Sequence, residues 1–361
     1  MSDARQSVEL FVPGRLCLFG EHADWAGARG PHLGYCLVIG TDQGITAEAR
    51  PSDEFAVESQ IPDADGRPSG RVRRMSCPFE PDALREAACD QDEFFRYCAG
   101  VAHQMADVPG VGGLEVRITA MDLPLRKGVS SSAAVCILLA RAFDAVYDLR
   151  LFPHELMEAA YHGERLTGSG CGRMDQACIY GKTPVLLTFG SKAEPRVEPV
   201  FPGGDVQMFF VDLAGRKDTV RILTDLQAAH PRSRELQEAL GPANERVVRR
   251  AYRALSSGDA ERLGALMREA QELFDTAVAP HSRDELAGPL LHELLGWEEL
   301  APHVHGGKGV GSQGDGTAQF VARSAEDREA AMARIAEQYP QMRCYPLTIA
   351  ATAPTGAAQH A

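Results

Sequence analysis

Cysteine pairs at metal-binding or redox spacing are missing from this sequence. Its nine cysteines are scattered, and none is followed by another after two intervening residues. An odd number of scattered cysteines indicates neither a disulfide framework nor a structural zinc site. Long apolar runs are missing too, and the first residues are polar with no apolar stretch behind them. We therefore expect a protein of a reducing compartment, the cytoplasm, that is neither exported nor inserted in a membrane.

Positive charge is also scarce. The formal net charge is −13 at pH 7, the chain has five lysines, and its basic residues form no long run. A surface of this sign repels phosphate backbones, so no nucleic-acid partner is expected and any anionic ligand needs a local site. Lys127, Lys217 and Lys308 lie beside glycine or in expected loops. A compact ammonium there could contact phosphate, although the placement of three lysines could also be chance.

Length and composition favour two domains. The chain has 361 residues, of which 44% are hydrophobic, which is ample for two cores. We expect domains at residues 1–181 and 182–361 in a protein of the α+β class. The first half predicts strands at 8–12, 16–19, 36–40, 44–49 and 114–119 and helices at 82–105, 131–147 and 153–166. The second half predicts strands at 185–189, 206–211, 317–321 and 343–350 and helices at 233–240, 243–255, 259–274, 292–299 and 325–338.

An apolar run that ends in a cluster of ionisable side chains lies at residues 13–24. Its alternation up to Phe19 predicts a strand, and Gly20 supplies the backbone freedom for a turn. Buried cations and carboxylates need a partner or a ligand, so the cluster indicates a site for a small polyhydroxylated ligand. A solvated, charged turn is the alternative interpretation. The four side chains are those of Arg15, Glu21, His22 and Asp24.

A second motif, residues 124–134, follows an expected strand and opens a helix that is apolar nearly all round. The first turn of a helix has unpaired N–H groups and partial positive charge, so it stabilises an anion. Three successive serines after a glycine exceed what a helix cap requires, although a serine cap is the purely structural alternative. We predict a phosphate loop, different from the GxxxxGK[ST] type. Its candidate contacts are Lys127, Gly128, Ser130, Ser131, Ser132 and Ala133.

Two carboxylates downstream complete a possible catalytic set. Glu164 lies near the end of an expected helix, and Asp175 lies between a glycine-rich stretch and an apolar run. Each alone is more typical of a helix surface or a helix start. Together with a phosphate loop they supply a magnesium ligand and a carboxylate for an acceptor hydroxyl. Phosphoryl transfer requires these parts.

In their order along the chain, these motifs resemble those of the GHMP kinases, the superfamily of galactokinase, homoserine kinase, mevalonate kinase and phosphomevalonate kinase. Residues 13–24 are similar to the sugar-binding signature of galactokinases, and residues 124–134 and the glycine-rich residues 306–316 to two further family motifs. The resemblance implies a ribosomal-protein-like amino-terminal domain and a ferredoxin-like carboxy-terminal domain, with the active site in the cleft between them. It also implies ATP, Mg²⁺ and a small sugar as ligands.

The resemblance further implies roles for individual residues. Asp175 would accept or orient the proton of the substrate hydroxyl, and Arg15 beside it would keep it ionised and stabilise charge on the transferred group. Ser132 and Glu164 would hold the magnesium ion. The other implied contacts are those of Glu21, His22, Asp24 and Gly172 with the sugar, and of Lys127, Gly128, Ser130, Ser131, Ser132 and Ala133 with the phosphates.

Residues after the first motif bear on the substrate. Asp24 favours a sugar, because mevalonate kinases have apolar residues at this position. Galactokinases usually continue with Tyr-Asn-Gly-Gly, whereas here Trp25 leads into an added loop, residues 28–34, so a sugar other than galactose is expected. Trp25 could stack on a sugar face or belong to the core. Lys217 could border the substrate pocket or be a solvated loop residue.

The leading hypothesis is therefore ATP-dependent phosphorylation of a hydroxyl of a monosaccharide or sugar derivative, with the anomeric hydroxyl as one candidate. Two alternatives keep the same fold. One is a mevalonate-type hydroxy-acid kinase, and the other is a sensor that binds sugar and ATP without transferring phosphate.

Overall fold

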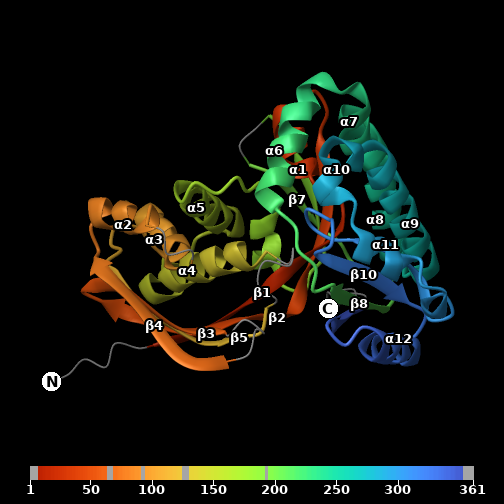
Figure 1. Cartoon of the computed structure of the whole chain (residues 1–361). Helices are drawn as coiled ribbons and strands as arrows, with labels where there is room; N and C mark the ends of the chain where they lie inside the picture. The colour runs from red at the N-terminus through yellow and green to blue at the C-terminus, as the bar shows by residue number, and fades with distance from the viewer. Residues whose placement is uncertain (1–6, 63–67, 91–93, 124–129, 192–193, 353–361) are drawn as a thin grey trace, which may run out of the picture. The chain divides into compact units, whose positions relative to one another are not determined.

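Two groups of closely packed elements make up the chain in a computed structural model, which describes residues 7–62, 68–90, 94–123, 130–191 and 194–352 (Figure 1). Unit 1 comprises residues 1–17, 38–182 and 192–195, and unit 2 comprises residues 18–37, 183–191 and 196–361. Strands β1 (Val8–Phe19) and β2 (Gly34–Ser52) supply residues to both units. The domain division at residue 181 stays a prediction, because the units are defined by packing and not by independent folding.

Unit 1 is built on a sheet of mixed direction. Strand β3 (Glu54–Pro62) pairs antiparallel with β4 (Pro68–Pro78) and parallel with β5 (Gly113–Met121), and β5 pairs antiparallel with β2. The strand order is β4-β3-β5-β2, and β1 also pairs with β2. Four helices cover one face of this sheet in Figure 1: α2 (Pro81–Ala88), α3 (Phe95–Met105), α4 (Ser131–Tyr147) and α5 (Pro153–Leu166). The 3₁₀ helix η1 (Asp175–Tyr180) follows them in the chain.

Helix α4 is the central helix of unit 1. Its residues 133–140 are all buried, which explains why the sequence there has no polar face. Such a helix is fixed by packing along its whole length, so its first turn has a defined position in the unit.

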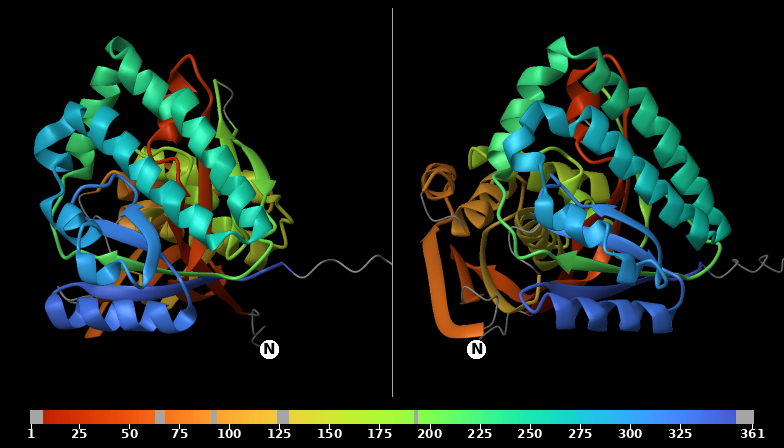
Figure 2. Two further views of the ribbon diagram at one scale, coloured as in Figure 1. Left: turned by 90° about the vertical axis from the view of Figure 1, so that its right-hand side faces the viewer. Right: turned by 45° about the vertical axis from the view of Figure 1, so that its right-hand side comes forward.

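Unit 2 contains an antiparallel sheet with the strand order β11-β8-β10-β9. Helix α12 (Ala325–Gln338) lies against one face of it, and α8 (Asn244–Ser257) and α9 (Ala260–Ala277) lie side by side (Figure 2). The strands are β8 (Val206–Asp212), β9 (Val304–Gly309), β10 (Thr317–Ala322) and β11 (Arg343–Ile349). A second pair, β6 (Val185–Phe189) and β7 (Arg196–Pro199), is also antiparallel, and β6 adjoins β2 in the order of the first sheet.

Several of the other helices of unit 2 share a second apolar core, which is separate from that of the four-stranded sheet and includes Trp25, Ile222, Leu240 and Phe274. The other described helices of unit 2 are α1 (Ala23–Arg29), α6 (Thr219–Ala229), α7 (Arg234–Glu238), α8 (Asn244–Ser257), α9 (Ala260–Ala277), α10 (Arg283–Leu286) and α11 (Pro289–Leu295). Short helical turns complete them: η2 (His230–Arg232), η3 (Ala239–Ala243), η4 (Ala279–Ser282) and η5 (Glu298–Leu300).

The α+β class is confirmed, and α4, α5, α12 and β6 have their predicted bounds. Predicted strands 8–12 and 16–19 are one strand, β1, and predicted strands 36–40 and 44–49 are both part of β2. The predicted helix 82–105 is divided into α2 and α3, and α1 and α6 are additional helices. Among the residues that the structure describes, no helix combines the length and the apolar character needed to cross a membrane.

Two glycines set the distance between α3 and α5. A Cβ atom on Gly100 would lie 2.2 Å from the carbonyl oxygen of Gly163, and one on Gly163 would lie 2.7 Å from Cα of Val101. Neither approach is sterically allowed, so the two backbones touch at this crossing. Glu164 follows Gly163 directly, and the crossing therefore positions its side chain.

Substitution of Gly100 by alanine should separate these helices. We expect Gly100→Ala to lower the free energy of unfolding by about 2–3 kcal/mol through overpacking, measured by urea denaturation. Gly170→Ala is the matched control, because a Cβ atom there meets no atom within 4 Å. Equal stability of the two variants would show that the crossing is not a tight constraint.

Candidate active site

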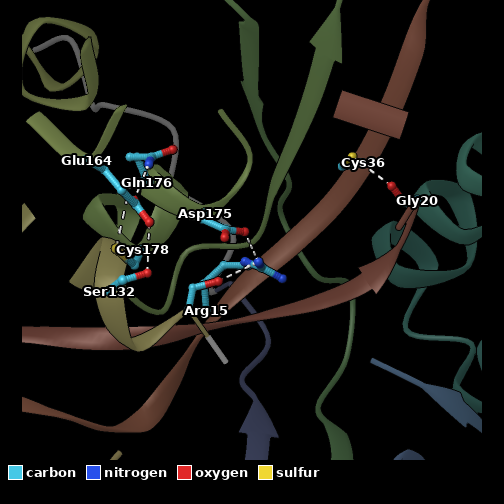
Figure 3. Close-up of polar contacts among 9 residues, drawn as sticks. Arg15, Gly20, Cys36, Ser132, Glu164, Asp175, Gln176 and Cys178 are labelled. Atoms are coloured by element: carbon cyan, nitrogen blue, oxygen red, sulfur yellow. Dashed lines mark hydrogen bonds and ion pairs between the residues drawn. The ribbon is translucent and has the colours of Figure 1, made fainter. Parts of the chain in front are cut away.

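In unit 1, three distant segments meet at the guanidinium group of Arg15. The Nη2 atom of Arg15, on β1, donates hydrogen bonds to the Oδ1 atom of Asp175, at the start of η1, and to the Oγ atom of Ser130. Figure 3 shows Arg15 and Asp175 pointing toward one another. The Arg15 side chain is 3% exposed and that of Asp175 is 28% exposed. The structure thus brings the two predicted catalytic residues together, with the carboxylate on the accessible side of the pair.

Ser130 has an unusual backbone conformation at the N-terminus of α4. Its φ and ψ angles are 59° and 47°, which is the left-handed region that non-glycine residues rarely adopt. Among the described residues its side chain makes no capping hydrogen bond to α4, and it accepts one from Arg15 instead. The first turn of α4 holds Ser131, Ser132 and the fully buried Ala133 and has no acidic side chain. Its N–H groups and positive dipole end suit an anion.

Two of the predicted phosphate contacts, Lys127 and Gly128, lie outside the described residues. Their role stays a prediction from sequence. The predicted sugar contact Gly172 lies in unit 1, in the segment between α5 and η1.

A second cluster in unit 1 joins Ser132, Glu164 and Gln176 (Figure 3). The Ser132 hydroxyl donates to Oε1 of Glu164 at 2.8 Å, and the Gln176 amide donates to Oε2 at 3.0 Å. Burial raises the pKa of Glu164 to about 7, and the nearby charge of Asp175 contributes in the same direction. The hydrogen bonds from Ser132 and Gln176 oppose this rise without cancelling it. The ligand-free site therefore holds a carboxylate that is poorly stabilised in its charged form.

Hydroxyl and carboxylate oxygens are ligands that Mg²⁺ prefers, and Ser132 and Glu164 fit such an ion by their chemistry. Among the described residues, no group of three or more histidine, cysteine, aspartate or glutamate side chains could hold a metal. Mg²⁺ at Ser132 and Glu164 would thus need nucleotide phosphates or water as further ligands, which is its usual mode in phosphoryl transfer.

The thiols near this cluster do not add a nucleophile. Burial raises the pKa values of Cys136, Cys171 and Cys178 well above the ordinary range of a thiol. A thiol with a raised pKa stays protonated at neutral pH and is unreactive. Chemistry at this site therefore rests on its oxygen and guanidinium groups.

In unit 2, the end of the first motif contains a buried ion pair that the sequence did not predict. Lys308 on β9 donates to the Oε1 atom of Glu21 and, at 2.7 Å, to the carbonyl oxygen of Gly309. The side chains of Lys308 and Glu21 are 1% and 4% exposed. A lysine held in this way is not available to an anion from solution, so the possible phosphate role of Lys308 is not supported. Glu21 binds Lys308 through one of its oxygens.

The next residues in unit 2 are His22, Asp24 and Trp25, and all three are buried. The indole N–H of Trp25 donates to Nδ1 of His22 at 3.1 Å. Of the two interpretations of Trp25, the core one is confirmed, since its ring is 5% exposed and packs in the second apolar core. The hydrogen bond to His22 could not be read from the sequence.

Lys217 lies against the third motif of unit 2. A Cβ atom on Gly316 would lie 2.5 Å from Nζ of Lys217 and 2.6 Å from its Cε. The side chain thus packs along the glycine-rich residues 306–316. Contact of Lys217, or of residues 28–34, with a substrate stays a prediction.

Comparisons with known proteins agree with the motifs. Galactokinase of Thermococcus kodakarensis is 26% identical over 292 residues, which cover 73% of this chain and 76% of that protein. Galactokinase of Glaesserella parasuis is 23% identical over 374 residues, covering 91% and 88%. The match to galactokinase of Bacillus subtilis is 27% identical but spans 40% of that protein.

Solved structures share the fold of the whole chain. A Lactococcus lactis galactokinase complexed with galactose has a TM-score of 0.71 at 18% identity, covering 97% of this chain and 95% of that one. Methanococcus jannaschii mevalonate kinase has a TM-score of 0.70 at 16% identity, covering 98% and 100%. The chain therefore has the fold of these small-molecule kinases.

Residues 94–182 match the model of the family described as "GHMP kinases N terminal domain". This segment contains α4, Glu164 and Asp175, the elements on which the unit 1 clusters depend. This match confirms the resemblance of the chain to the GHMP kinases.

The raised pKa of Glu164 gives a testable dependence of stability on pH. Its ordinary value is 4.5, so between pH 4.5 and about 7 the folded protein retains a proton that the unfolded chain has released. Stability of the metal-free protein must then fall as pH rises through this window. Glu164→Gln should remove the fall and be more stable than the wild type at pH 8, by at most about 3 kcal/mol.

Urea denaturation in EDTA at pH 5, 6, 7 and 8 measures this difference. Glu9→Gln, at an exposed position on β1, is the control and should follow the wild type. Parallel pH profiles for Glu164→Gln and wild type would contradict the assignment.

The ion pair of unit 2 should show strong energetic coupling. Lys308→Met leaves the Glu21 carboxylate buried without its cation, and we expect a loss of about 3–5 kcal/mol. The double variant Glu21→Gln/Lys308→Met removes both charges and should recover most of that loss. Denaturation of the two single variants and the double variant gives the coupling. Additive losses would mean that the two charges do not depend on each other.

Proposed function

We propose that this protein is an ATP- and Mg²⁺-dependent kinase that phosphorylates a hydroxyl of a monosaccharide or sugar derivative. The observation that carries the proposal is the ion pair of Arg15 and Asp175 beside Ser130, at the N-terminus of the buried helix α4. A carboxylate, a buried cation and the N-terminus of a helix lie together in one part of unit 1, and this grouping supports the proposal.

Each of these groups has a defined task in phosphoryl transfer. The Asp175 carboxylate orients the attacking hydroxyl and accepts its proton, and its 28% exposure leaves it accessible to a substrate. Arg15 stabilises negative charge that develops on the transferred group. The first turn of α4, with Ser130, Ser131 and Ser132, binds phosphate oxygens through N–H and hydroxyl groups. Positioning and electrostatic stabilisation are what this reaction chiefly requires.

Ser132 and Glu164 would hold the magnesium ion. When bound, the ion neutralises charge on the phosphates of ATP. The hydroxyl oxygen of Ser132 and the carboxylate oxygens of Glu164 would hold the ion in place of the hydrogen bond that now joins them.

The acceptor is the finer part of the proposal. Asp24 supports a polyol, and galactokinase relatives support a sugar, while Trp25 and residues 28–34 depart from the galactokinase pattern. Because Glu21 is paired with Lys308, we expect His22 and Asp24 to make the main sugar contacts in unit 2, with Gly172 as a further predicted contact. A sugar other than galactose, accepting phosphate at the anomeric or another hydroxyl, fits these features.

A second candidate is a mevalonate-type hydroxy-acid kinase, which the fold shared with Methanococcus jannaschii mevalonate kinase supports. The third possibility, a sensor without transfer, is disfavoured by the intact set of Asp175, Arg15, Ser132 and Glu164.

ADP release with MgATP separates these candidates. The acceptor panel should include aldohexoses, aldopentoses, 6-deoxy sugars, uronates and N-acetylated sugars, together with R-mevalonate and L-homoserine. We expect turnover with at least one sugar. Turnover confined to R-mevalonate would select the second candidate. Binding of ATP and a sugar in calorimetry without ADP release would select the sensor.

Asp175→Asn tests the mechanism with the best acceptor. The amide cannot accept the proton, so we expect kcat to fall by about 10²–10⁴ while the circular dichroism spectrum stays unchanged. Asp148→Asn is the matched control, because Asp148 is an exposed aspartate of unit 1 in a backbone conformation that asparagine tolerates. Full turnover by a folded Asp175→Asn protein would refute the role of Asp175.

A further inference from the structure

Trp25 contributes more than apolar packing to unit 2. Its ring lies in the second apolar core and is only 5% exposed, so it presents no face to a sugar. Its one polar atom is nevertheless used, because the indole N–H donates to Nδ1 of His22 at 3.1 Å. His22 is itself 4% exposed. A buried hydrogen bond of this kind constrains both rings.

The direction of this hydrogen bond fixes the proton of His22. An indole N–H can only donate, so Nδ1 of His22 must be the acceptor and carries no proton. A neutral imidazole has one proton, which is then on Nε2. His22 in this arrangement is a hydrogen-bond donor at Nε2 and cannot accept there.

Other contacts hold the imidazole ring in place. It stacks on Phe274 with a centroid distance of 6.0 Å and an interplanar angle of 26°. The backbone of His22 has φ = 65° and ψ = −5°, the left-handed region that is costly for a residue with a Cβ atom. Such strain is retained where the surrounding structure fixes it, and it is concentrated at functional sites. His22 is thus fixed in backbone, ring plane and proton position at once.

We infer that Trp25 is a positioning residue, which sets His22 as an Nε2–H donor to an acceptor oxygen of the substrate. This inference rests on the proposed function for the identity of the substrate, but not for the state of His22. It assigns the substrate a hydroxyl, carbonyl or carboxylate oxygen at the position that His22 contacts. A substrate ammonium group at that position would be excluded, because both it and the Nε2–H of His22 are hydrogen-bond donors.

The tautomer of His22 can be measured in the ligand-free protein. Nitrogen-15 resonances of the imidazole rings distinguish protonated from unprotonated nitrogens, and His22→Gln identifies which of the 11 histidines is His22. We expect an unprotonated Nδ1 and a protonated Nε2 in the wild type. In Trp25→Phe, which keeps an aromatic ring and removes the N–H, both tautomers should be populated.

The other tryptophan provides the matched control. Trp297 is partly buried and packs edge-on against Tyr339 beside the core of the four-stranded sheet, so Trp297→Phe removes an indole N–H from the same unit without touching His22. It should leave the His22 resonances unchanged. A proton on Nδ1 in the wild type, or wild-type resonances in Trp25→Phe, would overturn the inference. Should Trp25→Phe fail to fold, the wild-type resonances alone decide it.

Kinetics with the best acceptor from the panel give a second readout. Trp25→Phe should raise the KM for the acceptor by about tenfold and change kcat and the KM for ATP much less. In a His22→Gln background Trp25→Phe should add nothing further, because the two residues act as one unit. An additive effect, or an equal change in both KM values, would reduce Trp25 to a core residue. Absence of turnover with every acceptor would refute the proposed function and leave the tautomer result standing.

Discussion

Unit 1 is organised around a buried guanidinium group that requires a counter-charge. A cation as enclosed as Arg15 costs more than a marginally stable fold can absorb unless it is paired and hydrogen-bonded. Its partners Ser130 and Asp175 lie 115 and 160 residues further along the chain. Folding of unit 1 must therefore bring β1, the start of α4 and η1 together. A site held by this requirement is organised before any ligand arrives, and such preorganisation is what electrostatic catalysis needs.

In unit 2 a buried charge likewise requires a partner, at the carboxy-terminal end of the motif at residues 13–24. Glu21 and Lys308 are separated by 287 residues and are buried together, so the turn after β1 is tied to the glycine-rich strand β9. The lysine also donates to the carbonyl oxygen of Gly309, whose N–H donates to Gln271 at 2.7 Å. Buried polar groups that are satisfied in this way specify one arrangement of the chain. Because Glu21 is held in place, the backbone of the residues that directly follow it, including His22, begins from a fixed position.

Much of the fold follows from local patterns, and the exceptions have physical reasons. Helices α5 and α12 were predictable from their apolar periodicity and flanking residues, and α4 was predictable from a long apolar run that follows three serines. The break predicted at Pro13 is absent, because β1, which pairs with β2, continues through Pro13, and a strand tolerates proline where its nitrogen has no ladder hydrogen bond to make. Charged residue types identified Arg15, Glu164 and Asp175 as site candidates. Sequence could not pair Lys308 with Glu21, because the two residues are 287 positions apart and meet only through tertiary packing. The contact of Trp25 with His22 is local, but it depends on the left-handed backbone of His22 before α1, which the sequence did not indicate.

The charge balance of the two clusters explains why they suit different ligands. In unit 2 one ammonium faces one carboxylate, and the described pair of Lys308 and Glu21 is neutral. In unit 1 the charge of Asp175 acts on the buried Glu164, and Arg15 pairs with Asp175. Burial raises the pKa of Glu164 to about 7, and the nearby charge of Asp175 contributes in the same direction. A divalent cation bound here would offset the repulsion between the two carboxylates. Without the cation, a proton on Glu164 offsets it. The arrangement of Glu164 and Asp175 thus supports the proposal that this part of unit 1 binds a magnesium ion together with a polyanionic ligand.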